Sequence, residues 1–89
     1  MKSTNLEIYT RSLCGDCQAL KQFLNDNNIS FKNYELDSKP EKERKLMQIT
    51  GNRIVPALVF SSGTLFKKPE KVFTGFGRNK ERIKHFLEI

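Results

Sequence analysis

The two cysteines of this chain stand three positions apart, in the segment Cys14-Gly15-Asp16-Cys17, and the sequence contains no third cysteine. This spacing argues against a structural role for the pair. A structural zinc site takes about four ligands, and the single histidine, His85, lies near the far end of the chain. A disulfide across so short a loop adds little stability. The pair therefore favours reversible redox chemistry.

The residues around the pair predict a strand, a helix and a second strand. Apolar and polar side chains alternate over residues 5–10, which indicates a short strand. After a loop at 11–13, apolar residues recur at helical spacing from the cysteines onward, until the turn-forming residues 25–28 end the helix. Residues 29–36 alternate again and predict the second strand.

A second helix follows, with start and stop signals of its own. Ser38 and Glu41 have the spacing of a capping box, and Pro40 suits the first turn. Gly51 is a helix-stop residue. We expect this helix to turn three apolar residues inward, Leu46, Met47 and Ile49.

The last part of the chain predicts a hairpin and a third helix. Residues 57–60 form a continuous apolar run that suits a buried strand, and residues 61–63 suit a turn. Residues 64–66 begin a strand that 67–70 interrupts, so 71–74 is expected as the edge strand, followed by a helix over 78–87. The order β-α-β-α-β-β-α predicts an α/β fold in which one central mixed sheet carries helices on both faces.

Length and charge narrow the possible functions. Eighty-nine residues correspond to a single domain, 1–89, with room for a thin core but not for a large cofactor cavity. The formal charge of +6 is scattered along the chain, which favours a solvated surface and acidic partners over a nucleic-acid groove. No apolar run is long enough to span a bilayer, and residues 1–5 do not have the pattern of a signal peptide. We therefore expect no membrane, no nucleic acid and no export.

The position of the cysteines predicts their separate roles. A sulfur at a helix N-terminus lies near free backbone N–H groups and the positive end of the helix dipole, which stabilise a thiolate. Cys14 is thus the expected nucleophile, and Cys17, one turn further in, the expected resolving thiol. Arg11 adds a nearby positive charge. Two interpretations of Asp16 stand side by side: a carboxylate that stabilises the first helical turn, or one that tunes the redox pair.

Three segments together resemble the glutaredoxin family and its relatives with the thioredoxin fold. The stretch from Tyr9 to Cys17 resembles the family's first strand, basic residue and redox loop. The segment Thr50-Gly51-Asn52-Arg53-Ile54-Val55-Pro56 is similar to its T-G-x-R-T-V-P motif, with Ile54 in place of Thr. Gly75-Phe76-Gly77 falls where the family has a glycine turn before the last helix. The three segments have the family's order and spacing and cover nearly the whole chain.

The resemblance implies further roles in substrate binding. Pro56 is expected to be a cis proline facing the cysteines, with the backbone of Val55 paired to a bound thiol substrate. Gly75 and Phe76 of the glycine turn, together with Arg11, complete the substrate-binding set that we expect. For Phe76, contact with the substrate and packing in the core are both open.

One departure from the family concerns the electron donor. Glutathione-using members carry an acidic or hydroxyl pair after the glycine turn, whereas Gly77 is followed here by Arg78-Asn79-Lys80. Thr74-Gly75-Phe76 is instead similar to the S-G-F segment of thioredoxin-like glutaredoxins, which supply electrons to ribonucleotide reductase and receive them from thioredoxin reductase. Glutathione and this flavoprotein reductase therefore both remain candidate reductants, and no bound cofactor or metal is expected.

The sequence leads to one main hypothesis and two alternatives. The main hypothesis is a monomeric, cytoplasmic dithiol–disulfide oxidoreductase that reduces protein or small-molecule disulfides through Cys14 and Cys17. A reducing compartment fits a chain with no other cysteine. The alternatives are a thiol-based redox sensor and a metal-handling protein whose two thiolates share a site across a dimer.

Overall fold

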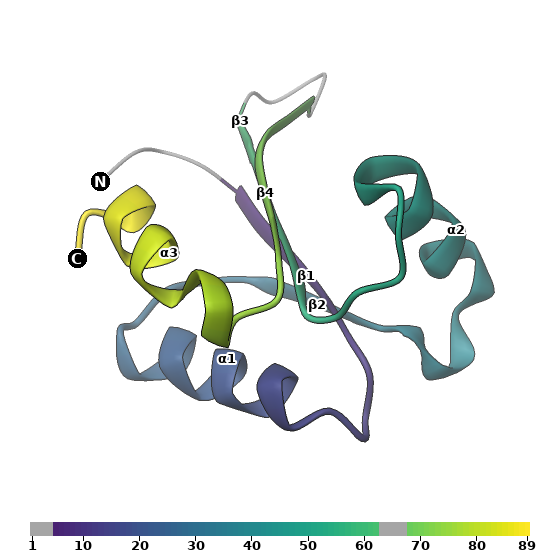
Figure 1. Cartoon of the computed structure of the whole chain (residues 1–89), viewed down its shortest axis with the longest axis horizontal. Coiled ribbons are helices and arrows are strands. Elements are labelled where there is room, and N and C mark those ends of the chain that lie inside the picture. Colours follow the sequence, from purple (N-terminus) through teal and green to yellow (C-terminus); the bar gives the residue numbers. More distant parts are fainter. Residues whose placement is uncertain (1–4, 63–67) are drawn as a thin grey trace.

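A four-stranded mixed sheet forms the centre of the molecule (Figure 1). The computed structural model describes residues 5–62 and 68–89. The strand order is β2-β1-β3-β4, in which β1 (Asn5–Thr10) runs parallel to β2 (Lys32–Glu35) and antiparallel to β3 (Ala57–Ser62). β4 (Lys68–Thr74) is antiparallel to β3 and lies at one edge. The predicted mixed α/β sheet is confirmed.

Helices cover both faces of this sheet, and each covered face has its own core. α1 (Gly15–Asp26) and α3 (Lys80–Leu87) pack on one face, and α2 (Pro40–Thr50) packs on the other (Figure 1). Ile8 of β1 belongs to the first core and its neighbour Tyr9 to the second, because successive strand residues point to opposite faces. β1 is therefore buried on both sides, which places the end of this strand, where the cysteine loop begins, on a rigid base.

The second strand is shorter than the sequence predicts. It spans Lys32–Glu35 instead of 29–36. Before it, the backbone N–H of Ile29 donates to the carbonyl of Leu24 at 2.9 Å, so this N–H is used at the end of α1 and not in the sheet. After it, Leu36 opens the short 3₁₀ helix η1 (Leu36–Ser38). The alternation of apolar and polar residues does not reveal that hydrogen bonds at both ends compete with strand pairing.

The predicted capping box of the second helix is wrong, although its end is confirmed. Ser38 lies in η1, and Lys39 takes the N-cap position without a side-chain hydrogen bond. Met47, expected inside, is 39% exposed, whereas Leu46 is fully buried. Gly51 ends the helix with a φ of 78°, a left-handed conformation that favours glycine, and its N–H donates to the carbonyl of Met47.

The edge of the sheet also differs from the prediction. β4 begins at Lys68, so the segment expected to interrupt the strand is partly within it. Pro69 is accommodated because β4 is an edge strand and the register shifts between Phe60 and Ser61 of its partner. The turn expected over 61–63 is wrong at Ser61 and Ser62, which still belong to β3 and pair with β4. Residue 63 and the strand expected at 64–66 lie outside the described residues. A 3₁₀ helix, η2 (Gly77–Asn79), precedes α3, where one continuous helix was expected.

The described helices are short, and none of them is long and apolar enough to cross a membrane.

Candidate active site

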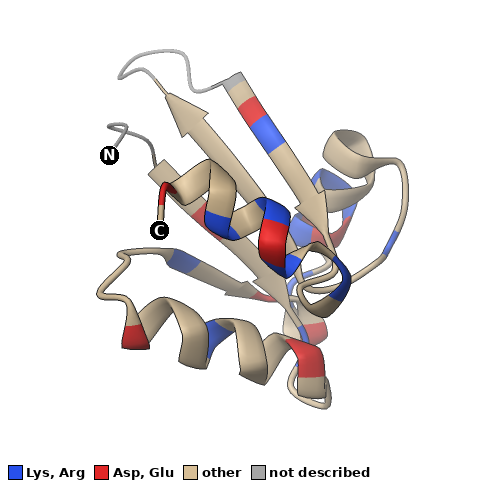
Figure 2. Cartoon of the chain, turned by 60° about the vertical axis from the view of Figure 1, so that its left-hand side comes forward, with Lys and Arg blue, Asp and Glu red and all other residues tan. Residues whose placement is uncertain are grey.

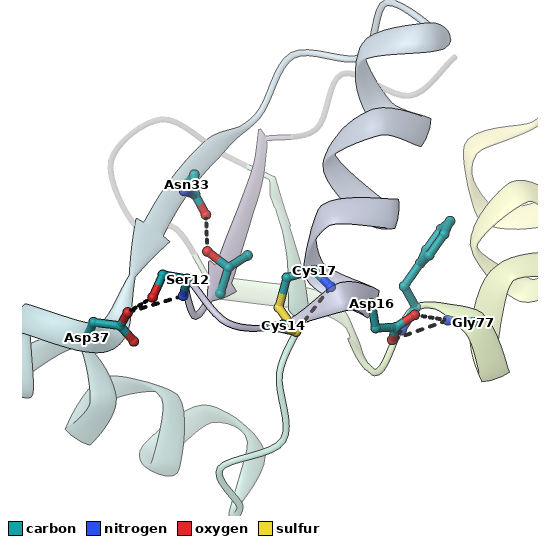
Figure 3. Close-up of a disulfide and its surroundings, with 9 residues drawn as sticks. Ser12, Cys14, Asp16, Cys17, Asn33, Asp37 and Gly77 are labelled. Carbon is teal, nitrogen blue, oxygen red and sulfur yellow. Dashed lines mark hydrogen bonds between the residues drawn. A yellow bond between two sulfur atoms is a disulfide. The ribbon is translucent and has the colours of Figure 1, made fainter.

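The cysteine pair lies at the junction between the loop after β1 and the start of α1 (Figure 3). Cys14 is the N-cap residue, with extended backbone, and its Sγ accepts a hydrogen bond from the N–H of Cys17 at 3.1 Å. A disulfide joins the two residues, whose Cα atoms are 5.2 Å apart. Cys14 is partly exposed, and Cys17 is fully buried. An incoming disulfide therefore meets Cys14 first.

Two side-chain contacts hold the loop before the cysteines against the α2 side of the molecule. Arg11 forms an ion pair with Glu43 of α2. Ser12 donates both its hydroxyl and its backbone N–H to Asp37 of η1 (Figure 3). These two donors hold the pKa of Asp37 below its ordinary value. The sequence analysis did not identify Glu43 or Asp37, because neither has a local signal that links it to the loop.

Between these anchors and the nucleophile stands Leu13, whose side chain is 99% exposed. Leu13 directly precedes Cys14 in the chain, and its side chain lies in solvent. The sequence analysis did not single out this residue, because a leucine in a short loop forms no distinctive sequence pattern. Arg11, by contrast, was predicted near the pair, and the structure turns its guanidinium toward Glu43.

The proline segment precedes β3, and a backbone hydrogen bond links it to the glycine turn. The Val55–Pro56 peptide bond is cis, as the family resemblance implies. Pro56 is buried, and Val55 is partly buried. The carbonyl of Pro56 accepts a hydrogen bond from the N–H of Gly75 at 2.7 Å. Two of the segments that carry the family resemblance thus lie in direct contact.

The glycine turn requires a glycine at position 75. Its φ is +89°, and a Cβ added there would lie 2.9 Å from the Nε of Arg78. That guanidinium donates to the carbonyl and to the hydroxyl of Thr74, at 2.8 and 2.9 Å. Asn79 donates to the same carbonyl and to that of Gly75. Glycine is needed at this position for both its conformation and its lack of a side chain.

The ring of Phe76 faces the core instead of the surface. It is 5% exposed and packs against Phe23 of α1, with ring centroids 5.3 Å apart. Of the two possibilities that the sequence left open, packing is the one observed. A substrate contact at this residue would have to be made by its backbone.

Asp16 connects the cysteine loop to the glycine turn (Figure 3). Its carboxylate accepts the N–H of Phe76 at 2.8 Å and the N–H of Gly77 at 3.1 Å. These hydrogen bonds join residues 60 and 61 positions apart in the sequence. We call this set of bonds the Asp16 contact. Together with the bond between Gly75 and Pro56, it links all three family-like segments around the cysteines.

Two tyrosines, one in β1 and one in β2, lie in the core on the α2 side of the sheet. Tyr9 and Tyr34 pack with ring centroids 5.2 Å apart, and the hydroxyl of Tyr34 donates to Glu7 at 2.8 Å. Burial, with a smaller effect of Glu7, raises the pKa of each from 10.0 to about 12. The Tyr9 hydroxyl is buried without a hydrogen-bond partner among the described residues.

Within residues 5–62 and 68–89, no three or more His, Cys, Asp or Glu side chains are grouped so that they could hold a metal ion.

Comparison with known families agrees with this arrangement, since residues 6–65 match the family model for glutaredoxins. The chain belongs to the glutaredoxin family. It is 30% identical to glutaredoxin 3 of Escherichia coli K12 over 54 residues, which is 61% of this chain and 65% of that protein. The match thus spans slightly less than two thirds of that relative. A putative glutaredoxin of Mycobacterium tuberculosis H37Rv is 31% identical over 70 residues, 78% of this chain and 83% of the relative.

Solved structures show the same fold at lower identity. A glutaredoxin of Archaeoglobus fulgidus aligns with a TM-score of 0.75 and 22% identity, covering 98% of this chain and 89% of that one. The Plasmodium falciparum thioredoxin aligns with a TM-score of 0.69 and 14% identity, covering 98% and 72%. The buckwheat glutaredoxin–glutathione complex aligns at 0.66 and 23%, covering 97% and 72%. The fold predicted from the resemblance, the thioredoxin fold, is confirmed.

Proposed function

We propose that this glutaredoxin-family protein is a dithiol–disulfide oxidoreductase. The observation that supports the proposal best is the unequal exposure of the two sulfur-bearing residues. Cys14 is partly exposed at the N-cap of α1, and Cys17 is buried one turn away, within disulfide distance. A nucleophile that the substrate reaches, backed by a thiol that it does not, is the arrangement that a two-step exchange requires.

The proposed reaction transfers two electrons from the reduced pair to a substrate disulfide. The Cys14 thiolate attacks one sulfur of the substrate, which forms a mixed disulfide and expels the other sulfur as a thiolate. The Cys17 thiolate then attacks the Cys14 Sγ. The second substrate thiolate leaves, and the Cys14–Cys17 disulfide remains. The leaving thiolates take up protons from solvent, and the protein must be reduced again before the next cycle.

We propose two candidate reductants, both of which are used within the family. Glutathione is one candidate, and the buckwheat relative was solved in complex with it. Thioredoxin reductase is the other, favoured by the cationic Arg78 and Lys80 after the glycine turn, which would repel an ammonium group. In neither route does the protein carry a bound cofactor. Disulfide-containing proteins such as ribonucleotide reductase are the proposed substrates.

The proposed substrate-binding set comprises the loop, the cis-proline segment and the glycine turn, through Arg11, Val55, Pro56, Gly75 and the backbone of Phe76. We add Leu13 to this set because of its exposure. The protein is proposed to act as a monomeric electron carrier in the cytoplasm, where it would contribute to redox homeostasis.

A coupled turnover assay tests the function and identifies the donor. A small mixed disulfide is supplied with glutathione and glutathione reductase in one reaction, and with thioredoxin reductase in another. Turnover that Cys14→Ser abolishes in either reaction is the expected result, and the reaction that works names the reductant. Absence of turnover in both would contradict the enzyme and favour the redox sensor. A stoichiometric metal in the purified protein would favour the metal-handling alternative.

A further inference from the structure

The outer edge of β4 and the side of α3 enclose a groove that the reaction above does not use. It consists of two adjoining hollows of about 490 and 440 Å³, which share Lys71, Phe73 and Arg82. We call it the β4–α3 groove. Figure 2 shows the two elements running beside each other, with Lys and Arg on both. Thr74 and Arg78, which line the groove, flank the glycine turn, whose backbone the Asp16 contact joins to the cysteine loop.

Positive charge dominates the first hollow. Lys71, Arg78 and Arg82 line it together with the polar Thr74 and Asn79. None of these three cations is paired with a carboxylate of the described residues: Arg78 donates to Thr74, Arg82 to the side-chain oxygen of Asn79, and Lys71 lies over the ring of Phe73. Cations gathered without counter-charges favour an anionic occupant.

The second hollow is mainly apolar and continues the first. Phe73 and Phe86 line it, with His85 and a single carboxylate, Glu81. An occupant that fills both hollows therefore combines negative charge with apolar side chains.

The strand edge supplies a further constraint, because among the described strands β4 pairs only with β3 and on one side. The N–H of Gly75 donates to the carbonyl of Pro56, so these two residues form a hydrogen-bonded pair. Along an antiparallel ladder, hydrogen-bonded pairs alternate with pairs that share no hydrogen bond. The backbone N–H and C=O groups of Val72 and Thr74 therefore point away from β3, to the open edge. The Thr74 carbonyl already accepts from Arg78 and Asn79. Val72 lines the groove and presents both its N–H and its C=O there, and no hydrogen bond to either group is seen within the described ranges.

We propose that the β4–α3 groove docks an extended acidic segment of the protein substrate, which pairs its backbone with Val72 and places its carboxylates against Lys71, Arg78 and Arg82. Alternating N–H and C=O groups on a strand edge complement a peptide backbone, which a nucleic acid lacks. A second copy of this chain is disfavoured, because pairing two such edges would bring two sets of like charges together. This inference rests on the proposed oxidoreductase function.

The test uses single turnover, so that no external reductant is needed. Pre-reduced protein is mixed with peptides that carry a disulfide-linked chromogenic thiol, followed by an extended flank that is either acidic and apolar or basic and apolar. An uncharged small disulfide serves as the reference substrate. At low salt the acidic peptide is expected to react about tenfold faster than the basic one, since exposed charge pairs act mainly on association and each has a small effect.

A matched pair of charge reversals separates the groove from the general charge of the protein. K71E/R82E alters the groove, whereas R44E/K45E makes the same change of charge on exposed positions of α2. The preference for the acidic peptide is expected to disappear in the first variant and to persist in the second. Methylation of alternate backbone nitrogens in the acidic flank should also reduce it, because this removes strand pairing without changing charge.

Several outcomes would overturn the docking proposal while the function stands. The first is that K71E/R82E and R44E/K45E lose the preference for the acidic peptide equally, and the second is that this preference survives in K71E/R82E. The third is that the protein binds a single-stranded oligonucleotide more tightly than the acidic peptide. Self-association through the β4 edge, seen as a dimer that K71E/R82E alters, would also overturn it. If the wild type fails to react with the uncharged disulfide, it is the proposed function that is contradicted.

Discussion

The Asp16 contact makes a quantitative prediction, because it is the only side-chain link that the described residues provide between the cysteine loop and the glycine turn. Asp16→Ala removes an ionised acceptor and leaves the N–H groups of Phe76 and Gly77 to be satisfied by water. Hydrogen bonds to charged groups contribute about 1.5–3 kcal/mol each, but Asp16 is exposed, so we expect the two bonds together to stabilise the fold by about 2 kcal/mol. For a domain of this size, a loss of 1 kcal/mol lowers Tm by roughly 4–8 °C.

The assay is thermal unfolding followed by circular dichroism, with the pair held oxidised and, separately, reduced. Asp26→Ala is the control for loss of an exposed carboxylate from the same helix, since Asp26 lies at the C-terminal end of α1 and accepts a local bond from Gln22. Asp16→Asn keeps an acceptor oxygen and should fall between wild type and Asp16→Ala. If Asp16→Ala unfolds within about 0.5 kcal/mol of Asp26→Ala, a typical range for neutral surface changes, the contact has no structural role.

Three further changes test other parts of the structure. Gly75→Ala should destabilise the fold by roughly 1–2 kcal/mol, because a residue with a side chain is strained at positive φ and its Cβ would meet a neighbouring arginine. Urea titration measures the change, and an unchanged unfolding midpoint would contradict this prediction. Tyr9 and Tyr34 each have a pKa raised from 10.0 to about 12, so the native state holds these protons longer than the unfolded one, and stability should fall as pH rises from 10 to 12. Absorbance near 295 nm should show tyrosinate in the folded protein only near pH 12, or at lower pH on unfolding, and titration near pH 10 in the folded protein would refute the burial argument. The depressed pKa of Asp37 means that its bonds to Ser12 contribute at neutral pH and are lost in acid, so the difference in Tm between wild type and Asp37→Asn should shrink as pH falls below about 4.

The sequence predicted best where structure follows from short-range pattern. The helix that starts at the cysteines, the left-handed stop at Gly51 and the apolar run of β3 all depend on neighbours within a few residues. The cis bond before Pro56 followed from the family resemblance instead. Where local signals competed, prediction failed. Ser38 has the sequence of a helix cap, yet it is used in η1, so the cap position passes to Lys39.

The candidate site divides along the same line. Cys14 and Cys17 carry their chemistry in their spacing and in their place at a helix start, and the sequence alone therefore predicts both the pair and the order in which the two sulfurs act. The pairing of Arg11 with Glu43, the exposure of Leu13 and the hydrogen bonds of Asp16 to a turn 60 residues away depend on tertiary structure. These contacts form between segments that lie far apart in the sequence and meet only in the folded protein. No periodicity or motif within one segment encodes which distant backbone N–H a carboxylate will reach.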